Sequence, residues 1–475
     1  INDYETFFYT LLFFLPCMLI ACGGSDDTPD GDNNPPVVVP PDEEPVDSRL
    51  LYNGIRLPEQ WPPVRSSSSE LEKGMSPFYL SDKPSVINIS VGRQLFVDNF
   101  LIESTNLKRT LYYPEYYSGN PILTPEQDWE KTGTKGAAFA APFSDGVWYD
   151  EKEGKYKMWY MAGGGSYATS GAGVTCYAES TDGIHWTKPT LSVVAGTNIV
   201  DYNSERDASV IWLDKQESNA SKRYKMFLVA RESGKWRYRY KTSPDGKVWR
   251  AAAQSEPIAD RSTVYKNPFR NVWVYSMRHN VRVDANKLVR ARDYNENADP
   301  EVGTKKAEAL LSAFWFGPWA NEQRHTDYPN IAPAIYNQDA TPYESIMLGF
   351  FSVWQGPEND VCASDNVIKR NQVMVGYSRD GYSWFREDMN PFHAVNTTTS
   401  DAWNQGNLQS VAGAPLIVGD KLYFYLSGRR LRGTQEITTT GLATLRRDGF
   451  ASMKGTGELQ TPLLKFDGSY FFVNA

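Results

Sequence analysis

The strongest constraint on the fold is a short phrase that recurs along the chain: a serine, any residue, Asp-Gly, two further residues and a tryptophan. The phrase begins at Ser180, Ser243 and Ser378, and the segment 447–450 is a degenerate partial copy. A pair of short runs of aromatic and β-branched residues precedes each copy, and another such pair, without the phrase, lies between the second and third copies. Repeated units of roughly 65 residues with several short strands each are typical of a β-propeller, in which every unit forms one blade.

Each unit contains two runs that we expect to pair as an antiparallel hairpin, and a third run before them that ends at a turn residue. The hairpins are expected to begin at Tyr156, Tyr224, Val272, Ile346 and Leu422. The sequence therefore predicts an all-β fold, a five-bladed β-propeller over residues 51–475. Residues 86–117 hold one or two extra strands, which we expect to complete the last blade and close the ring, because closure leaves no exposed sheet edge. We interpret the Asp-Gly pairs as turns and the tryptophans as packing between blades.

The first residues predict where the protein resides. Residues 7–21 form an apolar run of fifteen, which is short for a bilayer that needs about 20 residues to cross. The run ends at Ala21-Cys22-Gly23, and this ending resembles the lipobox of bacterial lipoproteins, in which the cysteine is acylated. The resemblance implies a lipoprotein signal peptide over residues 1–22 and lipidation of Cys22. An ordinary signal peptide with an incidental cysteine is the alternative.

Residues 23–50 are rich in Pro, Asp and Gly and contain no aromatic residue, so they predict a flexible acidic tether that cannot bury enough apolar surface to fold. Acids placed soon after such a cysteine resemble the export signals of surface lipoproteins in Gram-negative glycan degraders. We therefore expect an outer membrane lipoprotein that faces the periplasm or the cell surface. Its contact with the membrane would be through the lipid anchor only.

Charge and cysteine usage exclude other classes of protein. The formal net charge is −8, but the eight acids between Gly23 and Ser48, with no base among them, supply the excess. The folded part is near neutral, which disfavours a nucleic-acid binder. Cys176 and Cys362 are too far apart in the sequence to suggest a metal site. We expect both to be free thiols, and a disulfide between them is the alternative. We expect a monomer without a cofactor, and leave open a structural calcium ion.

The candidate site follows from propeller geometry, because the starts of the innermost strands converge at one mouth of the channel. Acids and arginines stand at that phase of the repeat. The three carboxylates that we select for catalysis are Asp207, Asp260 and Glu344. The candidates for substrate binding are Asp145, Arg206, Arg261, Arg278, His279, Trp315, Asp327, Gln409 and Arg429. For His279, a core histidine without a role in binding is the alternative.

The strands of the YKMWY type, each followed by YAES-TDG-x-x-W, together with Arg206-Asp207 at the start of the second unit, resemble the five-bladed propeller glycoside hydrolases of families 43 and 32. The resemblance covers about residues 86–475. It implies a carbohydrate substrate and three carboxylates around the channel mouth, with Asp207 as the residue that holds sugar hydroxyls. The Asn-Asp-Pro-Asn-Gly and Glu-Cys motifs of the fructosidases are absent.

Glycosidic bond hydrolysis needs one protonated acid and one ionised carboxylate. Glu344 stands between a tyrosine and an apolar strand, where desolvation would raise its pKa and suit a proton donor. Asp207 and Asp260 each neighbour an arginine that would keep them ionised. We therefore assign Glu344 as general acid, Asp207 as orienting or base carboxylate, and Asp260 as alternative base or nucleophile. Structural ion pairs for the aspartates and a turn cap for Glu344 are the alternatives.

The sequence therefore predicts a glycoside hydrolase that acts on plant or algal polysaccharide by carboxylate acid–base catalysis. Two other functions fit the same ring. A surface glycan-binding lipoprotein would use the cleft without catalysis, and its carboxylates need not approach one another. A lyase or phosphorylase would need a tyrosine, histidine or lysine base, or a cluster of cations for phosphate.

Overall fold

A computed structural model describes residues 47–131, 137–168, 173–202, 205–285, 287–399, 401–413 and 415–474. The expected signal peptide, Cys22 and nearly all of the tether lie outside these residues. Within them the chain is mostly β-strand with a few short helices, as expected for an all-β fold. No helix in this described part is long and apolar enough to span a bilayer.

The strands follow one another in groups. Before the first group stand α1 (Ser67–Glu70), η1 (Phe78–Leu80), β1 (Val86–Asn88), β2 (Ser104–Thr105), β3 (Lys108–Leu111) and β4 (Glu115–Tyr116). The first group holds α2 (Asp128–Lys131), β5 (Ala138–Ala141), β6 (Val147–Asp150), β7 (Lys155–Ala162), η3 (Gly165–Tyr167), β8 (Val174–Ser180) and β9 (Ile199–Asp201). The second holds β10 (Glu205–Leu213), η5 (Ala220–Lys222), β11 (Tyr224–Glu232), β12 (Lys235–Ser243) and β13 (Arg250–Gln254).

The later groups repeat this pattern. The third holds β14 (Thr263–Asn267), β15 (Val272–Arg282), β16 (Leu288–Asn297), α3 (Pro300–Lys306) and β17 (Ala313–Phe316). The fourth holds β18 (Ala334–Tyr343), β19 (Ile346–Gly356), α4 (Asn359–Asp365) and β20 (Arg370–Ser378). The fifth holds β21 (Asn407–Val411), β22 (Leu416–Val418), β23 (Lys421–Arg432) and β24 (Gln435–Arg446), and β25 (Ala451–Lys454), β26 (Leu459–Gln460) and β27 (Leu463–Lys465) follow it.

Each expected hairpin is present as an antiparallel pair: β7 with β8, β11 with β12, β15 with β16, β19 with β20, and β23 with β24. The apolar runs predicted ahead of them form β6, β10, β14, β18 and β22. The alternating aromatic and β-branched residues account for this, because such side chains pack well on a pleated sheet. The sequence pattern therefore identified these hairpins correctly.

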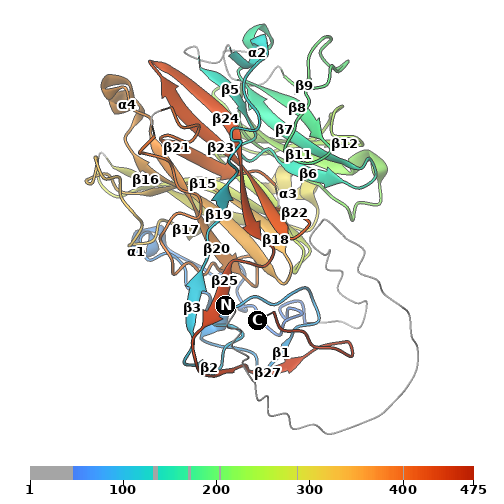
Figure 1. The fold of residues 1–475 in the computed structure, drawn as a ribbon, viewed down its shortest axis with the longest axis vertical. Coiled ribbons are helices and arrows are strands. Elements are labelled where there is room, and N and C mark those ends of the chain that lie inside the picture. The colour runs from blue at the N-terminus through green and yellow to red at the C-terminus, as the bar shows by residue number, and fades with distance from the viewer. Residues whose placement is uncertain are drawn as a thin grey trace, which may run out of the picture. The chain divides into compact units, whose positions relative to one another are not determined.

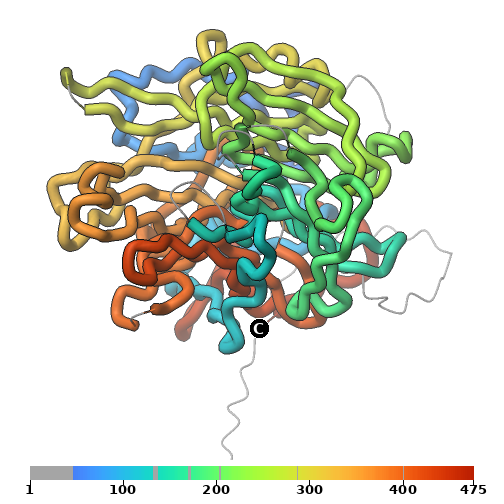
Figure 2. The backbone as a smooth tube through the Cα atoms, turned by 90° about the horizontal axis from the view of Figure 1, so that it is seen from above, coloured from blue at the N-terminus to red at the C-terminus, as the bar shows by residue number. Residues whose placement is uncertain are grey.

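The groups follow one another around a common centre, as the colour sequence in Figure 2 shows for residues 137–450. The first strands of successive groups are in contact, β10 with β14 and β14 with β18. The last hairpin reaches the first group, because β24 pairs in parallel with β5 through Ile437 and Ala138. The interior between the groups is filled mainly by aromatic rings, and Trp159, Trp273 and Trp384 are fully buried.

The Asp-Gly phrases are turns, as the sequence predicted. In the second group the carboxylate of Asp245 accepts backbone N–H bonds from the two residues after Gly246, and Gly246 has a φ of 76° that favours glycine. A Cβ on Gly246 would lie 2.3 Å from the Trp159 ring of the preceding group, and the Trp159 indole donates to the Gly246 carbonyl at 2.6 Å. The turn therefore joins neighbouring groups.

The same contact links the last group to the first. The Tyr425 hydroxyl of β23 donates to the carbonyl of Gly183 at 2.8 Å, and a Cβ on Gly183 would lie 2.6 Å from that hydroxyl. Gly183 belongs to the turn after β8. A glycine is required here because both a positive φ and a close approach meet at one residue.

The strands β1 to β3 and the strands that follow β24 lie together at one end of the hairpins (Figure 1). β1 pairs with β27, β2 with β26 and β3 with β25, and β4 pairs with β24. The extra strands predicted within 86–117 are therefore present. Buried Arg379 forms an ion pair with buried Asp98 at 2.8 Å, which fastens this segment to the turn after β20.

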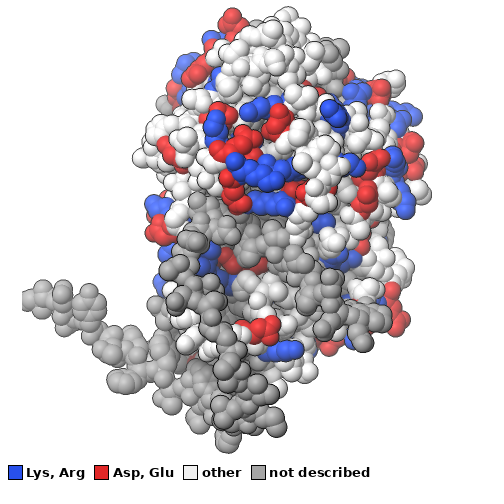
Figure 3. All heavy atoms as spheres, turned by 90° about the vertical axis from the view of Figure 1, so that its right-hand side faces the viewer, with Lys and Arg blue, Asp and Glu red and all other residues white. Residues whose placement is uncertain are grey.

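Charges are intermixed on the face drawn in Figure 3, where basic and acidic side chains lie next to one another. This mixture fits the near-neutral charge of the folded part. Both cysteines of the described chain, Cys176 and Cys362, are free thiols. No group of three His, Cys, Asp or Glu side chains that could hold a metal ion is found among the described residues.

Candidate active site

Two aspartates from consecutive strand groups approach each other near the start of β14. Asp207 lies in β10 and Asp260 lies just before β14. The carboxylate of Asp207 accepts a hydrogen bond from the Arg261 backbone N–H at 2.7 Å and forms an ion pair with its guanidinium at 3.0 Å. Asp260 forms an ion pair with Arg278 of β15. The structure therefore brings together four of the residues that the sequence selected.

The two aspartates differ in their surroundings. Burial and the nearby negative charge of Asp207 raise the pKa of Asp260 above its ordinary value, although Arg278 and Arg261 act in the opposite direction. Asp207 has a guanidinium and a backbone N–H directed at its oxygens. The two carboxyl groups therefore interact with each other while each is paired with an arginine of its own. Both side chains keep some exposure, 12% for Asp207 and 29% for Asp260.

Cations surround Tyr336 of β18 beside this pair. The guanidinium of Arg261 lies 5.4 Å from the ring centroid of Tyr336, that of Arg290 lies 5.7 Å from it, and Lys369 Nζ lies 5.9 Å from it. Burial alone would raise the pKa of Tyr336, but the charges of Arg261 and Lys369 outweigh it and hold this pKa below the usual value for tyrosine. Arg429 of β23 contributes in the same direction.

Trp354 of β19 completes the group, because Arg290 lies 5.0 Å from its ring. Its ring is nearly buried, with 5% of the residue exposed. We use the name mouth cluster for Asp207, Asp260, Arg261, Arg278, Arg290, Tyr336, Trp354, Lys369 and Arg429. The cluster combines an acid pair, several cations and two aromatic rings, which are the residue types that bind and cleave sugars.

Glu344 does not belong to the mouth cluster, so its predicted convergence with Asp207 and Asp260 is wrong. Glu344 forms the turn between β18 and β19, with Tyr343 paired to Ile346. Tyr336 is eight residues earlier on the same strand, which places Glu344 roughly 25 Å from the cluster. The sequence suggested otherwise because acids at either end of a strand look equivalent when the strand direction is unknown.

At its own end Glu344 is a structural residue. Its carboxylate accepts the Arg93 backbone N–H at 3.0 Å and forms ion pairs with Arg93 and Arg447, each at 3.3 Å. The hydroxyl of Ser345 donates to the Arg93 carbonyl at 2.8 Å. A Cβ on Gly92 would lie 2.6 Å from the Glu344 backbone. The alternative interpretation of Glu344, as a residue that fixes a turn, is therefore the correct one.

Asp145 and Arg206 are also structural, which corrects their assignment to substrate binding. The Arg206 guanidinium contacts Asp145 at 2.8 Å and Thr175 at 2.6 Å. Both side chains of this ion pair are buried, with 2% and 0% exposed. A substrate could not reach them without rearrangement.

Trp315 and His279 do not face the mouth cluster either. Trp315 is fully buried and donates its indole N–H to the Tyr382 carbonyl at 3.0 Å, so it packs between groups rather than binding sugar. His279 follows Arg278 in β15 and points to the opposite face, where it lies 2.9 Å from Asp293. This hydrogen bond raises the pKa of His279. The assignment of Trp315 to substrate binding is therefore wrong, because its burial is not visible in the sequence, whereas a binding role for His279, whose side chain is 34% exposed, stays a prediction.

Two further candidates stay predictions. The Asp327 side chain is 75% exposed, and its backbone N–H donates to His325 at 3.0 Å, with no contact to the cluster recorded among the described residues. Gln409 is buried in β21, two residues after Asn407, which pairs with Arg429. The Gln409 side-chain nitrogen has no hydrogen-bond partner within the described ranges. It could donate to a ligand only after a local opening.

A buried polar network lies between the groups. The Asn337 side chain donates to Ser144 at 3.2 Å, to Ser410 at 3.1 Å and to Asp339 at 3.2 Å. Burial raises the pKa of Asp339 to about 7. These residues come from three different strand groups, so the network fixes their relative positions.

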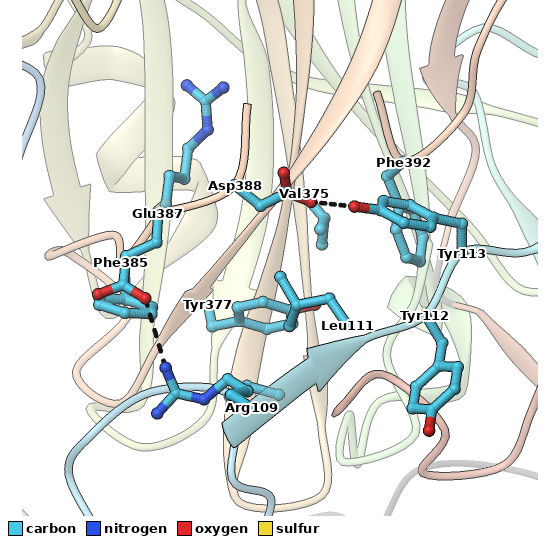
Figure 4. Close-up of a pocket in the computed structure, with 12 residues that line it drawn as sticks. Arg109, Leu111, Tyr112, Tyr113, Val375, Tyr377, Phe385, Glu387, Asp388 and Phe392 are labelled. Atoms are coloured by element: carbon cyan, nitrogen blue, oxygen red, sulfur yellow. Dashed lines mark hydrogen bonds and ion pairs between the residues drawn. The ribbon is translucent and has the colours of Figure 1, made fainter. Parts of the chain in front are cut away.

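A hollow of about 380 Å³, which includes space open to solvent, lies between β3 and β20 (Figure 4). Arg109 and Glu387 form an ion pair at 3.4 Å across it, and the Tyr113 hydroxyl donates to Asp388. Its polar groups therefore bind one another and hold β3 in place. Tyr377, which lines this hollow, pairs with Leu348 in the half of β19 that is nearer to Glu344, away from the mouth cluster.

Sequence reasoning missed Tyr336, Arg290 and Lys369. Tyr336 stands inside an apolar run that predicts a strand, and nothing in the sequence marks it as a site residue. Lys369 is the residue before β20 and Arg290 lies near the start of β16. Both belong to outer strands, whereas the sequence argument concerned residues at the starts of the innermost strands.

Comparisons with known proteins assign no family. No family model matches the chain, and no curated protein matches it. Among solved structures, one described as a glycoside hydrolase is 13% identical and covers 75% of this chain and 96% of its own, with a TM-score of 0.43. A glycosyl hydrolase from Bacteroides ovatus is 11% identical and covers 76% of this chain and 100% of its own, with a TM-score of 0.39.

A third structure is described as belonging to a family of mannoside phosphorylases that contains glycoside hydrolases targeting β-1,2 mannosidic linkages in Candida mannan. It is 12% identical and covers 76% of this chain and 99% of its own, with a TM-score of 0.38. These likenesses do not assign an activity to this chain.

Proposed function

We propose that the protein is a glycosidase that cleaves a glycosidic bond at the mouth cluster, with Asp260 as the proton donor and Asp207 as the ionised carboxylate. The observation that carries this proposal is the acid pair itself. Two carboxyl groups from consecutive strand groups interact, burial and the charge of Asp207 raise the pKa of Asp260, and Asp207 is paired with Arg261. Such a pair is what glycoside hydrolysis requires.

The steps follow from the contacts. Asp260 gives its proton to the glycosidic oxygen as the bond to the anomeric carbon breaks. Asp207 faces the positive charge that develops on the sugar, either as the nucleophile or as the base that takes a proton from water. Arg261 holds Asp207 through its guanidinium and its backbone N–H, and Arg278 orients Asp260. In this role Asp260 replaces Glu344 as the acid.

The architecture that would place this pair is a closed five-bladed β-propeller over residues 51–475. The hydrogen bond from Tyr425 to Gly183 and the pairing of β24 with β5 support closure, because both join the last strand group to the first. The channel mouth of such a ring is the common end at which β10, β14 and β18 present the mouth cluster.

We further propose that a lipid on Cys22 anchors the protein to the outer membrane, facing the periplasm or the cell surface, and that residues 23–50 act as its tether. The protein would act as a monomer without a cofactor on plant or algal polysaccharide. The sequence around Cys22 supports the anchor. Metabolic labelling with a fatty acid, compared between the natural chain and a Cys22→Ala variant, tests it.

A second candidate function is a lyase, and Tyr336 favours it. In an elimination, the ionised oxygen of Tyr336 would take the proton next to a sugar carboxyl group. The neighbouring carbon–oxygen bond would break, a carbon–carbon double bond would form, and the leaving oxygen would take the proton of Asp260. The cations around Tyr336, which lower its pKa, are what such a base needs.

The test is a screen of the protein against plant and algal oligosaccharides with mass spectrometry of the products. Hydrolysis adds one water across the cleaved bond, whereas elimination gives one unsaturated product and no added water. The glycosidase proposal predicts the first result, together with its loss in Asp260→Asn. Binding of oligosaccharides without any product would instead identify a glycan-binding protein and would overturn the enzymatic proposal.

A further inference from the structure

We infer that the mouth cluster binds an oxyanion group, held beside Tyr336 by Lys369, Arg290 and Arg429. The chemistry required is that of a carboxylate or sulfate carried by the sugar, or of inorganic phosphate supplied as a co-substrate. This inference deepens the proposed function and rests on it for the identity of the sugar. The argument concerns the charge balance of the cluster.

Two cations of the cluster are paired with its two acids. Arg261 is paired with Asp207 at 3.0 Å and Arg278 is paired with Asp260. Both contacts involve side chains that are mostly buried, with 17% of Arg261 and 18% of Arg278 exposed. These two arginines therefore balance the charge of the two acids and position them.

Of the other three cations, Arg429 keeps one donor without an acceptor, Arg290 has a distant partner, and Lys369 has no ion-pair partner among the described residues. Arg429 is paired with Glu436 at 3.0 Å, but its Nε is buried without a hydrogen-bond acceptor in the described chain. Arg290 has Glu358 at 3.9 Å, and the Glu358 side chain is 57% exposed, so solvent screens that pair. For Lys369 Nζ no carboxylate lies within ion-pair distance among the described residues.

These charges converge on one place instead of being spread over a solvated surface. Arg290 and Lys369 both lie within 6 Å of the Tyr336 ring centroid, at 5.7 and 5.9 Å. The Trp354 ring beneath Arg290 is nearly buried. Like charges held close together against apolar rings repel one another, and a bound anion removes that repulsion. Arginine binds planar oxyanions with two parallel hydrogen bonds, while lysine supplies a compact charge.

The cations are also placed beside the acid pair. Arg261 contacts both Asp207 and the Tyr336 ring, so an anion held over Tyr336 lies next to the bond-cleaving carboxylates. An anionic sugar bound there would have its charged group fixed while the adjoining glycosidic bond reaches Asp260. Inorganic phosphate bound there would lie beside the anomeric carbon.

The experiment measures binding by calorimetry with ligand pairs that differ only in charge. The pairs are oligogalacturonate and its methyl ester, a sulfated algal oligosaccharide and its desulfated form, and inorganic phosphate against chloride at equal ionic strength. The inference predicts that at least one charged member binds about tenfold or more tightly than its neutral counterpart, or that phosphate binds where chloride does not. Which pair responds identifies the source of the anion.

The variants are Lys369→Met and Arg290→Met, and the matched control is Lys421→Met, which removes an exposed lysine at the start of β23, at the opposite end of that strand from Arg429. Lys369→Met should abolish most of the charge preference, and the control should keep it. Circular dichroism verifies that each variant is folded. Equal affinity for the charged and neutral members of every pair, together with no phosphate binding, overturns the inference. An equal effect of Lys369→Met and Lys421→Met also overturns it.

The outcome is separable from that of the proposed function. If Asp260→Asn cleaves glycans as fast as the natural chain, the proposed acid is wrong, yet charge-selective binding that depends on Lys369 would still hold. If cleavage needs Asp260 but charged and neutral glycans bind alike, the glycosidase proposal stands and the oxyanion inference fails.

Discussion

The two ends of the β18–β19 hairpin carry similar residues for different purposes. At one end, Tyr336 and Trp354 lie among arginines and a lysine beside Asp207 and Asp260. At the other end, Glu344 lies between Arg93 and Arg447. Both ends combine acids with arginines near aromatic rings. They differ in how completely the charges are satisfied and in what covers them.

At the Glu344 end the carboxylate has a backbone N–H and two guanidinium partners, and the segment before β5 packs over the turn. At the Tyr336 end two interacting carboxyl groups share the site with a surplus of cations. An acid whose partners are complete contributes to stability. Interacting acids that stay partly exposed, beside cations whose charge is not fully balanced, are available to a ligand.

The largest expected effect is on catalysis at the Tyr336 end. Replacing Asp260 by Asn should reduce kcat/KM on a glycan identified by the screen by about 10²–10⁴-fold, because the amide cannot donate a proton as an acid does. The measurement is the initial rate of product formation, with the unfolding midpoint recorded to verify the fold. A loss of less than about threefold would show that another group protonates the leaving oxygen and that the Tyr336 end is not the catalytic end.

The next effect concerns stability at the Glu344 end. Replacing Glu344 by Gln removes the charge that Arg93 and Arg447 face and should lower the free energy of unfolding by about 1–2 kcal/mol, a value reduced for solvent screening because Arg93 is half exposed. Activity should stay within about twofold, since this residue lies far from the acid pair. Urea denaturation and the same rate assay measure the two quantities. Full stability with lost activity is the reverse pattern and would reinstate Glu344 as catalytic.

The smallest expected effect is a pKa shift within the acid pair. The charge of Asp207 raises the pKa of Asp260, so Asp207→Asn should lower that pKa. Because Asp260 acts in its protonated form, activity should fall as pH rises through its pKa, and this limb should move to lower pH in the variant. Carbon NMR titration of the Asp260 carboxyl follows the shift without relying on residual activity. The pKa should be the same in Glu344→Gln and in the natural chain, and an unchanged Asp260 pKa in Asp207→Asn would show that the two aspartates are not coupled.

Much of the fold could be predicted from local patterns. The runs beginning at Tyr156 and Tyr224 form strands because alternating aromatic and β-branched residues suit a pleated sheet. Asp245-Gly246 forms a turn because the carboxylate caps two backbone N–H groups and glycine accepts a positive φ. These effects act within a few residues, so they are visible in a sequence.

The candidate site could be predicted only in part. Asp207, Asp260 and Arg261 could be predicted because acids and arginines recur at one phase of the repeat, and Arg278 and Arg429 as side chains able to bind hydroxyl or carboxylate groups. Glu344, Arg206 and Trp315 were misplaced because their roles depend on strand direction, on which face of the strand a side chain occupies and on burial. None of these is fixed by residue type.

The sequence by itself determined the hairpins, their turns and the near-neutral charge of the folded part, since each depends on neighbouring residues or on composition. Only the tertiary structure decided which charges meet. Lys369 and Tyr336 are separated by 33 positions in the chain, and their contact arises because the fourth strand group folds back on itself. Electrostatic interactions act through space, so a charge cluster of this kind exists only once the strands have been assembled.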